Sequence, residues 1–363
     1  MRERILAHLA ALVGFDTRNP PRRIGAGGIF DYLRAHLPGF EFELADHGAG
    51  AVSLLAWRGR GSRLFNVHLD TVPDSPGWSA DPHVLRVDGE RAIGLGACDT
   101  KGAAACLLAA AERSEGPVAM LFSSDEEAND ARCIAGFLRE DRGFREAIVA
   151  EPTQAQAVLA HRGISSARIA FRGRAGHASA ADALEQSAVH QALRWGANAL
   201  AQVERHAHAR FGGLTGLRFN VGRVEGGIKG NVVAPACEAL FNFRPLPSQD
   251  TDELHAAFRG CAHAPALEAY EERFRGPSLP AGDIAQAEDK RLAARDLADE
   301  LGLPVGNAVD CWTEASLFSA AGYTALVYGP GDIAQAHAAD EWVALAQLDE
   351  AAAAYLRIFG GGK

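Results

Sequence analysis

Four short motifs rich in histidine and carboxylate side chains stand where predicted strands end, and a fifth lies near the C-terminus. In chain order they are His68-Leu69-Asp70-Thr71, Asp99-Thr100-Lys101-Gly102, Asp125-Glu126-Glu127, Glu151-Pro152-Thr153 and Ala336-His337. Two histidines and several carboxylates, with no softer donor among them, suit zinc or another divalent first-row metal. A fold that brings these motifs together would create a metal site. The need to bring them together constrains the fold of this chain more than any other feature of its sequence.

The first part of the chain alternates helix and strand patterns. Helical spacing of apolar residues covers 5–13, 29–36, 103–112 and 134–140, and strand patterns cover 40–44, 52–57, 63–67, 118–122 and 147–150. This order predicts an α/β fold with a mixed, largely parallel sheet and helices on both faces. Because ligands in such sheets gather at the carboxyl ends of the strands, the polar motifs are expected to converge there.

The pattern changes after His161. Strand patterns at 165–172, 218–224 and 238–244 and helix patterns at 187–207 and 251–262 suit a small α+β module with one sheet face covered. The α/β character resumes at 285–301, 325–328 and 345–359, in the part that contains His337. The module is therefore expected to be an insertion. Residues 1–162 and 278–363 are predicted to form a discontinuous metal-binding catalytic domain, and residues 163–277 a lid or dimerisation domain.

The composition fits a globular protein and narrows the possible partners. The 363 residues are 48% hydrophobic and 23% charged, with a net charge of −10. This charge argues against nucleic acid or an anionic membrane surface as partner, and no apolar run approaches the ~18 residues of a membrane helix. Six cysteines without a C-x-x-C pair predict reduced thiols in a cytoplasmic protein. Glu3 and His8 interrupt the apolar N-terminus, which predicts an amphipathic helix and not a signal peptide.

Spacing within the motifs suggests what single residues can do. His68 and Asp70 are two apart at a strand end, so their side chains share a face, and Asp70 can accept from the ring nitrogen that does not bind metal. Glu126 and Glu127 are adjacent, so in extended backbone one can bind metal while the other faces a substrate. Taken alone, an Asp at position 99 also fits an ordinary helix N-cap. Lys101 is expected to be a solvated lysine.

Several stretches together resemble a known family. They are HLDTVP, GWSADPHVLRVDGERAIGLGACDTKG, SSDEE, AEPT, GHAS, NVV, RPLP, TEA and GPGDIAQAH. The chain resembles, over nearly its whole length, the dinuclear-zinc metallopeptidase and deacylase family, which includes acetylornithine deacetylase, succinyl-diaminopimelate desuccinylase, aminoacylase and glutamate carboxypeptidase. The TEA and GPGDIAQAH stretches look most like acetylornithine deacetylase and its near relatives. The resemblance implies a metal-dependent hydrolase.

The resemblance also implies roles for the metal motifs. It implies two divalent metal ions, zinc or cobalt, with one site able to be partly occupied. Asp99, which a non-proline cis peptide bond often follows in the family, would bridge the two ions. The implied terminal ligands are Glu127 with His337 for one ion and Glu151 with His68 for the other. Glu126 would be the general base, and Asp70 would orient a histidine ligand.

Four further residues receive substrate-facing roles from the resemblance. His177 in AGHAS would donate to the developing oxyanion, often across a dimer, and Arg244 in FNFRPLP would bind the substrate carboxylate. Asn231 in GNVV would assist, and Glu314 in WTEAS would line the cleft. Each also has a purely structural reading, as a turn former, a strand-end charge or a helix-start residue. The module pattern implies a homodimer through the lid domain.

The implied reaction is removal of an acyl group, in the simplest case acetyl, from the α-amine of a small zwitterionic N-acyl amino acid in arginine biosynthesis. Acetylornithine and acetylcitrulline both stay open as substrates. The stretch AADALEQSAVH after GHAS lacks the family's proline and glycine, and EEANDARCIAGF also departs from the common pattern. The alternatives are a desuccinylase or metallo-carboxypeptidase of the same family and, from another class, a metal-binding relative without catalysis.

Overall fold

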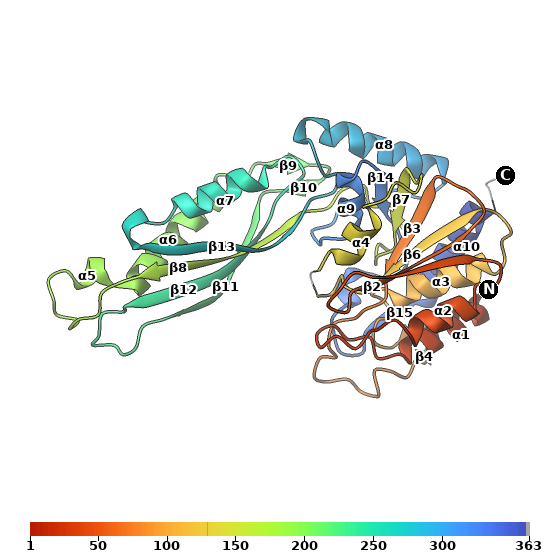
Figure 1. The fold of residues 1–363 in the computed structure, drawn as a ribbon, viewed down its shortest axis with the longest axis horizontal. Helices are drawn as coiled ribbons and strands as arrows, with labels where there is room; N and C mark the ends of the chain where they lie inside the picture. Colours follow the sequence, from red (N-terminus) through yellow and green to blue (C-terminus); the bar gives the residue numbers. More distant parts are fainter. Residues whose placement is uncertain (129, 361–363) are drawn as a thin grey trace. The chain divides into compact units, whose positions relative to one another are not determined.

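The computed structural model describes residues 1–128 and 130–360, which form two compact units (Figure 1). Unit 1 comprises residues 1–159, 289–307 and the chain from 313 onward, and unit 2 comprises Ala160–Glu288 and Ala308–Trp312. The predicted division at 162/163 and 277/278 placed residues 160–162, 278–288 and 308–312 with the catalytic domain, whereas here they belong to unit 2. Arg162 donates to the carboxylate of Asp310, and the indole of Trp312 donates to the carbonyl of Pro277 at 3.0 Å. These contacts attach 308–312 to unit 2.

Unit 1 contains a six-stranded sheet with the order β1-β2-β6-β3-β7-β14. The strands are β1 (Glu41–Asp46), β2 (Val52–Arg58), β3 (Arg63–His68), β6 (Val118–Ser123), β7 (Glu146–Val149) and β14 (Thr324–Val327). Strand β3 runs parallel to both β6 and β7, and β14 runs parallel to β7. Strand β2 is antiparallel to β1 and β6. The prediction of a mixed, largely parallel sheet is confirmed.

Helices cover both faces of this sheet (Figure 1). The helices of unit 1 are α1 (Arg2–Val13), α2 (Ile29–Ala35), α3 (Lys101–Ala111), α4 (Arg132–Phe137), α9 (Ala315–Ala320) and α10 (Leu345–Phe359), and α8 (Ala287–Glu300) begins at its boundary. Alternate strand residues such as Leu54 and Phe65 belong to the core under α1, α3 and α10. Their sequence neighbours Leu55 and Leu64 are also buried, but they do not belong to that cluster. No helix among the described residues has both the length and the apolar character needed to cross a membrane.

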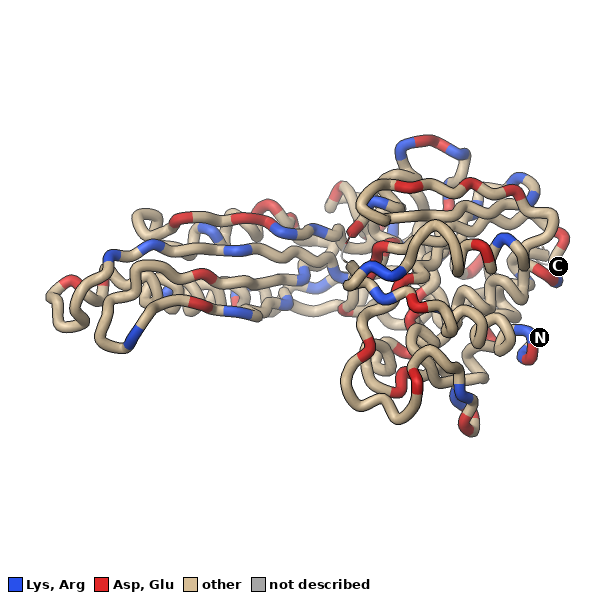
Figure 2. Tube along the Cα trace, turned by 60° about the horizontal axis from the view of Figure 1, so that its bottom comes forward, with Lys and Arg blue, Asp and Glu red and all other residues tan. Residues whose placement is uncertain are grey.

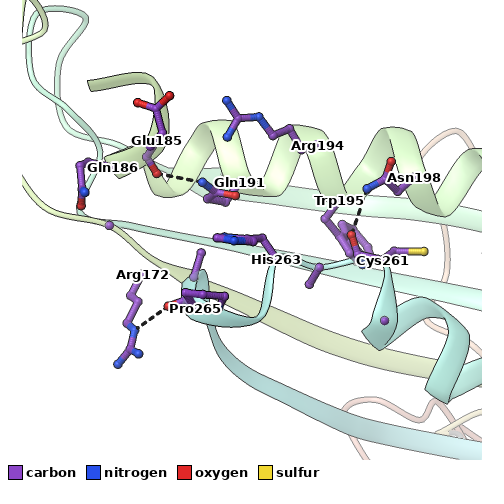
Figure 3. A pocket seen from close by; sticks show the side chains of 14 residues that line it. Arg172, Glu185, Gln186, Gln191, Arg194, Trp195, Asn198, Cys261, His263 and Pro265 are labelled. Atoms are coloured by element: carbon purple, nitrogen blue, oxygen red, sulfur yellow. Dashed lines mark hydrogen bonds between the residues drawn. The ribbon is translucent and has the colours of Figure 1, made fainter. Parts of the chain in front are cut away.

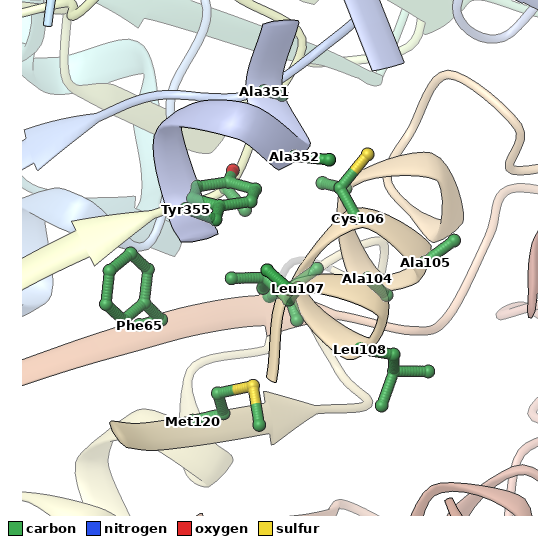
Figure 4. Close-up of a cluster of buried hydrophobic side chains, with 14 of the residues drawn as sticks. Phe65, Ala104, Ala105, Cys106, Leu107, Leu108, Met120, Ala351, Ala352 and Tyr355 are labelled. Atoms are coloured by element: carbon green, nitrogen blue, oxygen red, sulfur yellow. The ribbon is translucent and has the colours of Figure 1, made fainter. Parts of the chain in front are cut away.

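Helix α3 lies at the centre of the unit 1 core (Figure 4). Its sequence, KGAAACLLAAA, is buried on every side, and its small alanines let α1 and α10 pack closely against it. Leu107 lies among Phe65, Met120 and Tyr355 in Figure 4. Because α3 is packed on every side, it gives a rigid support to the turn at Asp99, which immediately precedes it.

Unit 2 is a four-stranded antiparallel sheet with helices on one face (Figure 1). Its strand order is β11-β12-β8-β13, and its main elements are β8 (Ile164–Arg172), α5 (Ala183–Gln186), α6 (Ala188–Glu204), β11 (Arg218–Gly226), β12 (Ala236–Arg244), α7 (Thr251–Gly260) and β13 (Leu267–Gly276). Acidic and basic residues are interspersed along this unit (Figure 2), and Arg168 pairs with Glu238 at 2.8 Å and Glu271 at 3.3 Å across three strands. One sheet face therefore carries ion pairs and the other an apolar core.

The remaining elements are short. They are β4 (Arg86–Asp88), β5 (Arg91–Ile93), β9 (Arg210–Phe211), β10 (Leu214–Thr215), β15 (Trp342–Ala344) and the 3-10 turns η1 (Ala264–Ala266), η2 (Ile284–Gln286) and η3 (Ile333–Gln335). Strands β15, β5 and β4 form a small sheet of their own. This sheet places the segment after His337 beside the segment that leads to Asp99.

Candidate metal centre

The predicted ligand motifs lie at the carboxyl edge of the unit 1 sheet. His68 is the last residue of β3, Glu126 and Glu127 follow β6, and Glu151 follows β7. Because β3 pairs in parallel with both β6 and β7, these three strand ends meet. His337 lies in the loop after β14, the next parallel strand. The topology therefore explains why residues far apart in sequence share one site.

Asp99 lies between the two histidines. His68 Nε2 is 3.0 Å from Asp99 Oδ1, and His337 Nε2 is 3.4 Å from Asp99 Oδ2. His68 Nε2 is also 3.8 Å from Glu151 Oε1, and His337 Nε2 is 3.2 Å from Glu127 Oε1. Two trios of potential ligands at this centre therefore share Asp99, and in each trio the potential ligand atoms lie within 4.8 Å of one another.

The local backbone turns Asp99 into this position. The peptide bond from Asp99 to Thr100 is cis, although no proline follows. Thr100 Oγ1 donates to the carbonyl of His68 at 2.7 Å, which ties the start of α3 to the end of β3. His337 has a φ of 59°, a left-handed conformation that few non-glycine residues adopt. Both ligand-bearing segments thus use unusual backbone at the residue that faces the centre.

Asp70 lies behind His68 and links two parts of the site. His68 Nδ1 is 3.0 Å from the carbonyl oxygen of Asp70 and 3.5 Å from its carboxylate, so the carbonyl is the closer acceptor. The other carboxylate oxygen accepts from Asn19 Nδ2 at 2.9 Å and from the backbone N–H of Glu127 at 3.2 Å. With Nδ1 facing acceptors, Nε2 is left to face the centre. Burial opposes protonation of His68, but hydrogen bonds to Asp70 and Asp99 raise its pKa well above the usual value.

Glu126 and Glu127 differ from the expected geometry. Residues 126–128 form a turn instead of an extended segment, so the two adjacent side chains do not point opposite ways. Both carboxylates reach the same cluster, with potential ligand atoms within 4.8 Å of His68. The period-two argument fails here because β6 ends at Ser123, three residues earlier.

Carboxylates outnumber histidines at this centre, and the pKa values reflect it. Burial raises the pKa of Glu126 and Glu151 well above the usual range, and repulsion by neighbouring carboxylates adds to the effect. Hydrogen bonds to Asp99 and Glu127 raise the pKa of His337 to about 11. Burial works against ionisation of Asp99, but hydrogen bonds from both histidines lower its pKa below the usual range. When ionised, the carboxylates of Asp99, Glu126, Glu127 and Glu151 outnumber the two histidines, and divalent cations would neutralise this excess of negative charge. The donor set of imidazole and carboxylate groups fits such ions.

Glu314 lies beneath the site and not in an open cleft. Its side chain is buried with 1% exposure, and Ser123 Oγ donates to its Oε2 at 2.8 Å. Its Oε1 has no hydrogen-bond partner among the described residues. Burial raises the pKa of Glu314 to about 8. This surrounding fits a buried neutral acid better than the predicted contact with substrate.

The three predicted residues of the inserted module all lie in unit 2, at two ends of it. His177 forms an isolated bridge with Val232, and the N–H of Ala178 donates to the carbonyl of Asn231 at 3.2 Å. His177 and Asn231 are therefore neighbours, and both are exposed. Arg244 is the last residue of β12, at the opposite end of the strand that follows Asn231.

Unit 2 also has a cavity of about 790 Å³ that the sequence did not predict (Figure 3). It lies between α6 and the segment after α7, where Asn198 Nδ2 donates to the carbonyl of Cys261 at 3.1 Å. Arg172 and Arg194 line it but point away from each other in Figure 3. None of the predicted lid residues lines this cavity.

Sequence reasoning misjudged Lys101 and overlooked Glu341. Lys101 was expected to be solvated, but it is fully buried, and its Nζ donates to the carbonyl of Phe15 at 3.0 Å. Burial lowers the pKa of Lys101 to about 7. The signal was present, because a helix as apolar all round as α3 is expected to be buried on every side. Glu341 is buried behind Asp99 and carried no motif that marked it.

Comparison with known proteins places this geometry in a family. Residues 64–360 match the model of peptidase family M20/M25/M40. The chain is 67% identical over 357 residues to N-acetyl-L-citrulline deacetylase of Xanthomonas campestris pv. campestris, covering 98% of this chain and 97% of that protein. It is 31% identical over 393 residues to acetylornithine deacetylase of Myxococcus xanthus, covering 98% of each.

Solved structures share the fold. The M20 family metallo-carboxypeptidase Sso-CP2 from Sulfolobus solfataricus superposes with a TM-score of 0.76 at 14% identity, over 98% of this chain and 99% of that one. The family match covers most of the chain. It agrees with the mixed sheet and with the two trios around Asp99 at the edge of that sheet. The chain belongs to peptidase family M20/M25/M40.

Proposed function

We propose that this protein is an N-acetyl-L-citrulline deacetylase that hydrolyses the amide bond of its substrate, releases acetate and serves arginine biosynthesis in the cytoplasm. The observation that carries the proposal is the 67% identity to such a deacetylase over nearly the whole of both chains. The site supports it, because two ligand trios around one shared carboxylate suit an amide hydrolase with two metal ions. The acetylornithine deacetylases are more distant, at about 31% identity.

We further propose that two divalent cations, zinc or cobalt, occupy the trios. His68, Asp99 and Glu151 would hold one, and Asp99, Glu127 and His337 the other. When bound, such ions polarise the scissile carbonyl and lower the pKa of an attacking water. The distances of 3.0 Å and 3.4 Å from the two Asp99 oxygens to different histidines support the shared role of Asp99.

The chain's own groups then supply the proton transfers. Glu126 lies in the cluster with its pKa raised by burial, so it is suited to take a proton from water and return it to the leaving amine. Asp70 fixes the orientation of His68 through the contacts at Nδ1. His177 and Asn231 would donate to the oxyanion, and Arg244 would hold the substrate carboxylate through its two-pronged guanidinium.

Substrate choice is the first test. With metal-loaded protein, we expect kcat/KM for acetate release from acetylcitrulline to exceed that from acetylornithine by about 100-fold or more. A site built for the neutral urea group of the citrulline side chain leaves the ammonium group of the ornithine side chain poorly paired. Preference for acetylornithine would refute the substrate assignment and keep the deacetylase class. Turnover of neither, with two metal ions bound, would favour the desuccinylase or carboxypeptidase alternative.

We propose a homodimer through the lid, for a geometric reason. His177 and Asn231 lie before β12 begins at Ala236, and Arg244 lies at its end. At a rise of about 3.3 Å per residue, the strand separates them by roughly 26 Å. An N-acetyl amino acid is far too short to touch both groups of one lid. A site that uses all three residues therefore needs two lids.

Helix α6 offers a suitable surface for that pairing. Leu193 and Leu200 are seven residues apart on one face and are 63% and 57% exposed, while Trp195 on the other face is buried in the core. Among the described residues, β11 is an edge strand of the sheet, and its Val224 is exposed. An exposed apolar helix face beside an open edge favours association with a second copy.

A mixing experiment tests the shared site. We expect His177→Ala and Arg244→Ala homodimers to be nearly inactive, and their co-expressed mixture to regain about a quarter of wild-type activity, because half the dimers are mixed and each has one intact site. Mixing His177→Ala with Asn231→Ala should restore nothing, since these residues are neighbours in one lid. Recovery in both mixtures, or in neither, would contradict the arrangement.

A further inference from the structure

Glu341 is a buried carboxylate behind the metal centre. Strand β15 pairs antiparallel with β5, with Trp342 opposite Ile93, and this ladder places residue 341 beside Gly94. The N–H of Gly94 donates to the carbonyl of Glu341 at 3.0 Å. The side chain is 2% exposed and lies among the backbone groups of the segment that ends at Asp99.

Both oxygens of this carboxylate hold the Asp99 turn. Oε2 accepts from the N–H of Gly96 at 2.9 Å, and Oε1 accepts from the N–H groups of Cys98 at 2.8 Å and Asp99 at 2.9 Å. An ionised carboxylate can accept all three bonds, because it has about four acceptor positions and no donor. A glutamine at 341 would have one acceptor oxygen and would turn an N–H donor toward another N–H.

The same residue belongs to the segment that presents His337. Residues 337 and 340 both have left-handed φ values, of 59° and 56°, so the chain turns tightly between the ligand and the carboxylate. The neighbouring Asp340 points elsewhere, to Ser79 Oγ at 2.9 Å and Arg86 at 2.8 Å. Glu341 is therefore where the segments of two predicted ligands, Asp99 and His337, are joined by hydrogen bonds.

We propose that Glu341 is a positioning residue for the metal centre: it fixes the backbone of Asp99 against the His337 segment, so that the two Asp99 oxygens lie near different histidines of the trios that would hold the ions. The inference rests on the proposed two-metal function. It assigns Glu341 no direct contact with metal or substrate. Partners of this kind behind metal ligands typically change metal affinity or activity by about 10–100-fold when they are replaced.

The test measures metal affinity directly. Metal-free wild type and Glu341→Gln would be titrated with Zn²⁺ against a competing chelator, and with Co²⁺ while its visible absorption is recorded. We expect Glu341→Gln to bind at least one ion about 10–100-fold more weakly than the wild type and to give a changed Co²⁺ absorption spectrum. The far-ultraviolet circular dichroism of the metal-free protein should be unchanged. Asp340→Asn is the matched control, since it removes the neighbouring charge and should keep wild-type affinity.

Each outcome decides the proposal. Wild-type affinity and spectrum in Glu341→Gln would overturn it. If Glu341→Gln does not fold, Glu341→Asp keeps the charge but shortens the reach: weakened metal binding in that folded variant supports the proposal, and wild-type binding overturns it. Failure of the wild-type protein to bind two ions would instead refute the proposed function, so the two failures are distinguishable.

Discussion

Replacement of Glu126 by glutamine is expected to lower kcat by about 10³-fold while both metal ions stay bound, because general acid–base groups contribute about 10²–10⁴-fold. Glu126 lies within the cluster formed with His68 and Glu127. Burial raises its pKa, which keeps it competent both to accept a proton and to return it. Glutamine keeps the shape and removes the proton acceptor. Steady-state acetate release and metal content by mass spectrometry measure the two effects.

The turn geometry gives this variant a second possible outcome. Residues 126–128 turn, and the Glu126 carboxylate lies in a group with His68 and Glu127 whose potential ligand atoms are within 4.8 Å of one another. Loss of a metal ion together with activity would therefore mean that Glu126 binds metal, and the base would have to be sought elsewhere. Glu140→Gln, whose side chain is 74% exposed beside Arg142, controls for the loss of one carboxylate and should leave kcat unchanged.

The metal-binding edge could be predicted because it follows from strand order. His68 ends β3, and Glu151 follows β7 by two residues, so a parallel sheet puts both at one edge whatever the loops do. The apolar runs at β3, β6 and β7 are fully buried and have clear patterns. Pairing of the ligands, by contrast, came from the resemblance to a family and not from spacing.

Other features depended on contacts that no local pattern reveals. Strand β13, LEAYEERFRG, was not predicted, because two register shifts against β8 break its alternation and its exposed residues are mostly charged. Strands β5 and β15 have three residues each, too few for a period. The burial of Glu341 results from their pairing, so it could be seen only in three dimensions. The period-two argument failed for Glu126, because β6 ends at Ser123.

Replacement of Asp99 by asparagine is expected to have the largest effect on the metal centre. Asp99 alone belongs to both trios, with its two oxygens 3.0 Å and 3.4 Å from different histidines. An amide offers one oxygen ligand and no charge, so it cannot bridge two cations. Metal content should fall from two ions per chain to one or fewer, and acetate release should fall by about 10⁴-fold or more, beyond the range for a lost general base alone.

Thermal unfolding provides an independent measure of the same loss. A ligand present at about 1,000 times its Kd stabilises the folded state by about 4 kcal/mol, so Zn²⁺ should raise the Tm of the wild-type protein by several degrees. Asp99→Asn should show little of this rise, while its metal-free Tm stays close to that of the wild type because asparagine keeps the volume. Asp88→Asn, on the exposed strand β4, should respond to Zn²⁺ as the wild type does. A full Zn²⁺ response in Asp99→Asn would show that each trio holds its ion without the shared carboxylate, and the bridging role would then be wrong.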